Sequence, residues 1–151
     1  MLIQITNTIW QHKMKNAAFT LTGYRFPKAT IDLTNLKSEG NSFAMNIAPS
    51  GKLNTATKEF DLKFIFTANL NDSDNPAIYV ECEARFVFAD VVSLDEIPEY
   101  FYPNSIAIIF PYLRAFVSTL SLQANYNPPV IIPTMNLSDL SEVLRRHVVV
   151  E

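Results

Sequence analysis

Few side chains in this sequence have the types and the spacing that acid–base chemistry requires. Glu81 and Glu83 lie two residues apart, so in a strand both carboxylates would point to one face, as a catalytic carboxylate pair would. A catalytic pair also needs an enclosed site that separates the two pKa values, and a solvated strand face does not provide one. We therefore interpret Glu81 and Glu83 as part of an exposed strand face.

Residue types that bind metals or act as nucleophiles are no better placed. Residues 72–76 begin like a calcium loop, but Pro76 replaces a ligand-type residue and the glycine and distal glutamate of such loops are missing, so the segment predicts a turn. Cys82 falls on the apolar side of a strand, which favours a small core residue. Neither His12 nor His147 has a partner at ligand spacing. The sequence therefore predicts no catalytic residue, no metal and no cofactor.

Composition excludes several classes of protein. The chain has 151 residues, of which 48% are hydrophobic, and this is enough for one domain with a substantial core. A net charge of -3 argues against nucleic acid and anionic lipid as partners. The first residues do not resemble a signal peptide, and no run approaches membrane-spanning length. We expect a cytoplasmic protein without direct membrane insertion, and the single cysteine is compatible with a reducing compartment.

The first two-thirds of the chain alternates apolar and polar residues with the period of a β-strand. Two half-buried strands are predicted within residues 19–34 and 43–47. A hairpin is predicted from residues 60–70 and 78–88, joined by the polar turn at 71–76. Consecutive strands with short connections favour an antiparallel sheet with one covered face.

The pattern changes near Asp95, after which residues 94–103 predict an irregular crossover. Helical spacing within residues 113–120 predicts a helix with Pro111 in its first turn. Asn136 is placed to cap a second, shorter helix, whose apolar stripe is Leu137, Leu140, Val143 and Leu144. The predicted class is α+β, with a four-stranded antiparallel sheet followed by a long helix and a short C-terminal helix. Residues 1–18 are interpreted as an N-terminal extension and residues 19–151 as a single domain.

Three short motifs in the last third resemble the signature of the SecB export-chaperone family. They are Phe-Pro-Tyr-Leu-Arg at 110–114, Asn-Pro-Pro at 127–129 and the segment at 133–140. The resemblance extends upstream to the strands at 19–32, 43–47 and 77–88. It implies a holdase that keeps new proteins unfolded, assembles as a homotetramer (a dimer of dimers) and passes its clients to the SecA motor.

The resemblance also implies where unfolded polypeptide would bind. The groove positions fall on Phe43, Met45 and Ile47 from one strand, on Ile78 from another and on Tyr112 in the long helix. Such a groove needs apolar side chains and free strand-edge groups that accept varied extended chains. The alternative for each strand position is an ordinary core residue.

Contact with SecA is implied for an outer sheet face at Asp32, Tyr79 and Glu81, where the alternative is a solvated face with no partner. Some features depart from the family. Lys28 stands where an acidic residue is common, the loop at 36–42 is shorter and lacks aromatic residues, and residues 1–18, with Trp10, have no counterpart. These departures affect the expected SecA contact more than the expected fold.

Three functions remain open at this point. The first is a chaperone that binds unfolded or newly made polypeptides for delivery to SecA. The second is a SecB-like chaperone dedicated to one client, such as an antitoxin, without SecA. The third belongs to another class: a small-ligand-binding domain or an enzyme that uses the groove.

Overall fold

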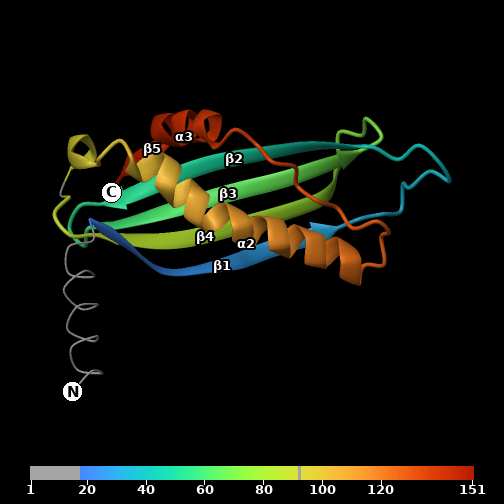
Figure 1. The fold of residues 1–151 in the computed structure, drawn as a ribbon, viewed down its shortest axis with the longest axis horizontal. Helices are drawn as coiled ribbons and strands as arrows, with labels where there is room; N and C mark the ends of the chain where they lie inside the picture. The colour runs from blue at the N-terminus through green and yellow to red at the C-terminus, as the bar shows by residue number, and fades with distance from the viewer. Residues whose placement is uncertain (1–17, 92) are drawn as a thin grey trace, which may run out of the picture.

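The computed structural model describes residues 18–91 and 93–151. Its elements follow the chain as β1 (Phe19–Ile31), β2 (Phe43–Asn54), β3 (Glu59–Leu70), β4 (Pro76–Phe88), the 3-10 turn η1 (Leu94–Glu96), α2 (Phe101–Gln123), α3 (Leu137–Arg146) and β5 (Val148–Val150). The strand order in the sheet is β1-β4-β3-β2-β5 (Figure 1). The predicted four-stranded antiparallel sheet, long helix and short helix are confirmed. The expectations for residues 1–17 concern residues outside the described part of the chain.

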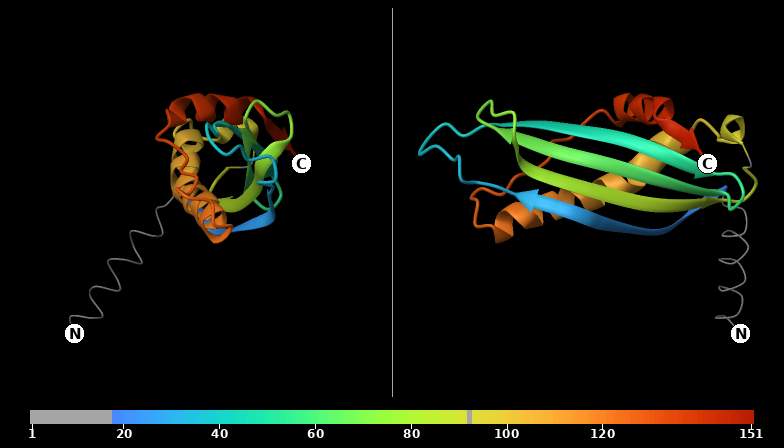
Figure 2. Two further views of the ribbon diagram at one scale, coloured as in Figure 1. Left: turned by 90° about the vertical axis from the view of Figure 1, so that its right-hand side faces the viewer. Right: turned by 180° about the vertical axis from the view of Figure 1, so that it is seen from behind.

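The sheet has an inner face that is buried and an outer face that is polar. Along β3 every second residue from Phe60 to Leu70 is buried, and β4 shows the same alternation from Ile78 to Phe88. The period-two pattern therefore sends one set of side chains into the core. Helix α2 crosses the inner face, and α3 lies beside β2 (Figures 1 and 2). Both helices pack against the core on the inner side of the sheet.

Helix α2 begins earlier than the sequence pattern predicted. It starts at Phe101, so the proline in its first turn is Pro103, and Pro111 lies inside the helix. The prediction that Pro111 begins the helix is therefore wrong. Pro111 is on the exposed side of α2, where water can bind the carbonyl that a proline leaves without its helical hydrogen bond. Part of the predicted irregular crossover is ordered as η1 and as the first turn of α2.

Helix α2 is also long and apolar enough to cross a membrane by length and composition alone. It has 23 residues, most of which are apolar. The expectation that no segment reaches such a length is wrong. The core helix of a soluble protein can have the same length and composition. The buried residues of α2 are spread along the helix from Phe101 to Ser121.

The end of the described chain contains one confirmed and one missed element. Asn136 caps α3 by accepting a hydrogen bond from the Ser138 backbone N–H at 3.1 Å, and Leu140 and Leu144 bury the apolar stripe. After His147 the chain forms β5, which pairs in parallel with β2. Three valines are too few to show a strand period, so β5 was not predicted.

Candidate functional site: an open strand edge

The edge of β2 away from β3 is only partly covered. In the regular β2–β3 ladder, the carbonyl of Ser42 accepts a hydrogen bond from the Asn71 N–H at 3.0 Å, so even-numbered residues of β2 direct their backbone toward β3. Odd-numbered residues point to the opposite edge, where Gly51 donates to the His147 carbonyl at 3.0 Å. Strand β5 pairs only with Gly51–Leu53. Upstream of Gly51, the backbone at this edge has no strand partner among the described residues.

Three of the predicted groove residues lie on this open stretch. Phe43, Met45 and Ile47 are odd-numbered, so their backbone groups point to the open edge while their side chains point to the inner face. Phe43 and Met45 are half-buried and Ile47 is buried. Phe43 and Met45 therefore offer main-chain hydrogen bonds and partly exposed apolar side chains side by side, as strand-addition sites do, whereas the Ile47 side chain belongs to the core.

The crossover at residues 124–136 contacts this stretch of β2 at Phe43. The ring of Tyr126 contacts the ring of Phe43 edge-on, with centroids 5.5 Å apart. The crossover is tied to α2 by hydrogen bonds from Arg114 Nε to the Ile132 carbonyl and from Ser118 Oγ to the Val130 carbonyl, both at 3.0 Å. The Val130 N–H also donates to Ser121 Oγ at 2.8 Å. The crossover is therefore held in place by α2.

The remaining two predicted groove residues lie elsewhere. Ile78 is completely buried in the inner-face core. Tyr112 lies on the side of α2 that faces β1, where its ring stacks on Tyr24 at 4.3 Å, and both rings remain about two-fifths exposed at 42% and 43%. A second stack, Phe26 on Phe116 at 4.1 Å, adjoins it. Within one chain, the five residues therefore belong to the open β2 edge, the core and an aromatic strip at β1.

Sequence reasoning missed the aromatic partners of this strip and of the β2 edge. Tyr24, Phe26 and Phe116 make the strip with Tyr112, and Tyr126 covers Phe43. Tyr24 and Phe26 fall among the register shifts of β1, where the simple alternation of sides is interrupted. A count of alternating residues could not have assigned them to the inner face.

The predicted SecA-facing residues lie on or next to the outer face, and their polar groups have partners. Tyr79 donates its hydroxyl to Glu81 at 2.7 Å, and this hydrogen bond is the main cause that lowers the pKa of the Glu81 carboxyl. Lys63 lies 3.7 Å from the same carboxylate, and Lys28 lies over the Tyr79 ring. Asp32, just beyond β1, accepts hydrogen bonds from the side chain and backbone of Thr34, which lower its pKa.

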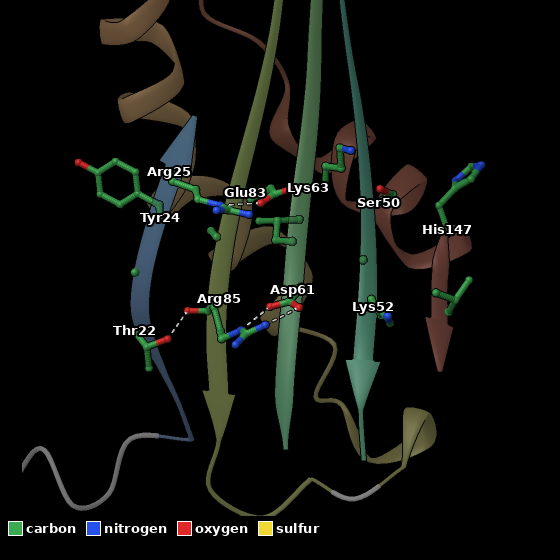
Figure 3. Close-up of a pocket in the computed structure, with 15 residues that line it drawn as sticks. Thr22, Tyr24, Arg25, Ser50, Lys52, Asp61, Lys63, Glu83, Arg85 and His147 are labelled. Atoms are coloured by element: carbon green, nitrogen blue, oxygen red, sulfur yellow. Dashed lines mark hydrogen bonds and ion pairs between the residues drawn. The ribbon is translucent and has the colours of Figure 1, made fainter. Parts of the chain in front are cut away.

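The outer face is hollowed, and its charges alternate in sign across the strands. The hollow has a volume of about 860 Å³ and spans β1, β4, β3, β2 and β5 (Figure 3). Arg85 makes two hydrogen bonds to Asp61, at 2.7 and 2.9 Å, and Arg25 pairs with Glu83 at 2.9 Å. These exposed pairs add little stability, but they leave the hollow without a strong field of either sign.

Comparisons with known proteins bear on the fold that carries these features. No family model matches the sequence. A segment of 65 residues is 37% identical to an uncharacterized protein of Methanocaldococcus jannaschii; the match spans 42% of this chain and 41% of that relative's length. A protein of unknown function from Streptococcus agalactiae is similar in structure at a TM-score of 0.42, with 11% identity over 77% of this chain and 97% of the other.

A stronger structural similarity is to the Mycobacterium tuberculosis Rv1957 SecB-like chaperone in complex with a ChAD peptide from the Rv1956 HigA1 antitoxin. The TM-score is 0.64 and the similarity covers 82% of this chain and 94% of that chain, at 16% sequence identity. The chain has the SecB-like chaperone fold. The resemblance inferred from the short motifs is thus confirmed for the architecture.

The side chains whose types could carry chemistry have structural surroundings. Burial raises the pKa of the Cys82 thiol to about 12, so the thiol stays protonated at neutral pH. The Tyr79 hydroxyl and the nearby Lys63 lower the pKa of the Glu81 carboxyl, which is opposite to what a general acid needs, and Glu83 is paired with Arg25. Residues 71–74 form a turn. Within residues 18–91 and 93–151 no group of three acidic, histidine or cysteine side chains could hold a metal ion.

Proposed function

We propose that this chain is a holdase chaperone that binds an extended segment of a dedicated client protein, such as an antitoxin. The open edge of β2 carries the proposal. There the outward main-chain groups of Phe43, Met45 and Ile47 have no strand partner among the described residues, the side chains of Phe43 and Met45 are partly exposed, and Tyr126 of the crossover contacts Phe43. An extended client would gain main-chain hydrogen bonds at the edge and apolar contacts beside it.

A dedicated client is favoured over delivery to SecA by the outer face. Attraction of a partner by an acidic face requires unpaired negative charge. Here Glu81, Glu83 and Asp61 each have a basic neighbour on an adjacent strand. Asp32, which accepts hydrogen bonds from Thr34, is therefore the one predicted contact carboxylate without an ion pair among the described residues. The solved SecB-like structure with an antitoxin peptide supports the same choice. We therefore propose that the partner engages the β2 edge and that SecA has no part. We expect the chaperone to act in the cytoplasm.

Met45→Asp is expected to weaken client binding by roughly tenfold or more, because a carboxylate beside an apolar client segment loses its water without gaining a partner. The measurement is the affinity of the chain for an unfolded, slowly folding precursor and for an antitoxin segment, by titration calorimetry. Asn46→Asp is the matched control. Its side chain lies on the outer face and its backbone faces β3, so the same charge one residue away should leave the affinity unchanged.

Equal loss of affinity in Met45→Asp and Asn46→Asp would contradict the proposed site. Saturation by one small molecule, with no suppression of aggregation of a denatured protein, would instead favour the ligand-binding class. Stoichiometric capture of SecA by the purified chain would restore the delivery function. Circular dichroism and native mass on both variants would show that the fold and the assembly are unchanged.

We further propose that the chain assembles as a homotetramer. Strand β1 forms the other edge of the sheet, and the aromatic strip of Tyr24, Phe26, Tyr112 and Phe116 beside it remains partly exposed together with Ile108. An exposed apolar strip next to an open strand edge promotes uncontrolled association unless a partner covers it. Native mass spectrometry is expected to give four copies, and a stable monomer at micromolar concentration would contradict this assembly.

A further inference from the structure

Strand β5 already occupies part of the edge on which the proposed function depends. It lies alongside Gly51–Leu53, with the Gly51 N–H donating to the His147 carbonyl and the Glu151 N–H donating to the Leu53 carbonyl at 2.8 Å. The edge of β2 thus accepts an extended, β-branched segment of this same chain. The open stretch from Phe43 to Pro49 continues directly from the stretch that β5 covers.

The attachment of β5 is slight. The strand has three residues, and Val149 and Val150 are 61% and 51% exposed. Glu151 adds an ion pair with Lys52 at 3.0 Å, in which both side chains are about half exposed and which is therefore worth little. Only Val148 packs against the core, and it is partly buried. A short edge strand held in this way opens far more readily than the central strands.

Pro49 marks the boundary between the open and the covered stretches. It is odd-numbered, so its nitrogen points to the open edge, but a proline has no N–H to donate. A client segment that ends at Pro49 can pair with the open stretch while β5 stays in place. A longer segment has to continue along Gly51–Leu53, where β5 lies.

We infer that β5 is an exchangeable strand that occupies the downstream half of the client edge and is displaced by clients longer than the open stretch. The inference rests on the proposed function, because it assigns the mode of binding at the same edge. The client it selects is an extended segment with apolar residues at alternate positions. Short segments of this kind bind beside β5, and long segments bind in its place.

The test uses two prolines one residue apart. The bonds of His147 and Glu151 to β2 place the N–H of Val149, midway between them, toward β2 and the N–H of Val150 away from it. Val149→Pro therefore removes a bond that holds β5, whereas Val150→Pro introduces the same residue at a position where an edge strand tolerates it. Both variants leave β2 and its side chains unchanged.

Two synthetic peptides serve as probes, one of about six and one of about twelve residues, each with valine alternating with lysine or threonine. For the long peptide, Val149→Pro is expected to bind roughly tenfold more tightly than the unmodified chain, because less of the resident strand has to be displaced. The short peptide should bind the unmodified chain, Val149→Pro and Val150→Pro with equal affinity. Val150→Pro should match the unmodified chain for both peptides.

Hydrogen exchange in the free protein gives a readout that needs no client. The amides of Val149 and Glu151 are expected to exchange roughly a hundredfold or more faster than the central amides of β3. Equal protection of the two sets would overturn the inference. Binding of both peptides with no effect of Val149→Pro on the long one would overturn the strand exchange alone. Failure of every protein to bind either peptide would overturn the proposed function together with it.

Discussion

Phe101→Ala should lower the free energy of unfolding by about 3–5 kcal/mol, the usual cost of removing a large aromatic side chain from a packed core. Phe101 is completely buried at the start of α2 and joins the helix to the sheet. Its ring meets Phe19, Phe60 and Phe88 with centroids 4.7–4.9 Å apart, and Phe86 at 5.5 Å. These four rings belong to β1, β3 and β4, so the Phe101 ring links α2 to three strands of the sheet.

Chemical denaturation of the full chain at fixed protein concentration would measure the loss, because the proposed assembly would make the apparent stability depend on concentration. Tyr100→Ala is the matched control. Tyr100 is 51% exposed, and among the rings of the described residues its ring meets only that of Phe19, at 6.4 Å, so its removal should cost less than about 1 kcal/mol. Similar losses in the two variants would show that Phe101 does not anchor α2 to the sheet.

Gly51→Ala should destabilise the fold by about 1–3 kcal/mol, although it adds only one carbon atom. Gly51 lies on the inner face of β2, where an added Cβ would overlap the ring of Phe60. That ring is completely buried and is held by Phe88 and Phe101, so it has little freedom to withdraw. The Gly51 N–H also donates to the His147 carbonyl, so a shift of the Gly51 backbone would weaken the pairing of β5 with β2.

Gly23→Ala tests whether the effect comes from overlap and not from the loss of a strand glycine. No atom lies within 4 Å of a Cβ built at Gly23, and alanine is favoured over glycine in a strand by about 0.5–1 kcal/mol. The unfolding midpoint should stay constant or rise slightly. A loss equal to that of Gly51→Ala would mean that Phe60 yields to the added carbon and that both effects have another origin.

Much of the fold could be predicted from local patterns. The hairpin of β3 and β4 followed from an alternation that runs uninterrupted from Phe60 to Phe88 apart from its polar turn, and α3 followed from its cap at Asn136. The start of α2 could not be predicted, because Pro103 and Pro111 are both compatible with a first turn and only the packing of Phe101 decides between them. Strand β5 forms because the edge of β2 is available for pairing. This pairing joins segments that are distant in sequence, so the local pattern around the three valines does not predict it.

The candidate site was predictable in part for the same reason. Phe43, Met45 and Ile47 share one face by the period of a strand alone. Tyr112 belongs beside β1 because of the direction in which α2 crosses the sheet, and this direction depends on contacts that are distant in sequence. The ion pairs of the outer face likewise depend on the register between strands, which places Arg85 opposite Asp61 and Arg25 opposite Glu83.

The hydrogen bonds that join the crossover to α2 have a consequence for the thermodynamics of capture. Because hydrogen bonds join Val130 and Ile132 to Ser118, Ser121 and Arg114, the crossover is already fixed in place before a client would bind in the proposed mode. For a client that pairs only with the open stretch of β2, the conformational entropy lost on binding would then come mainly from the client segment. Selectivity among clients would accordingly follow how readily each one adopts an extended shape by itself.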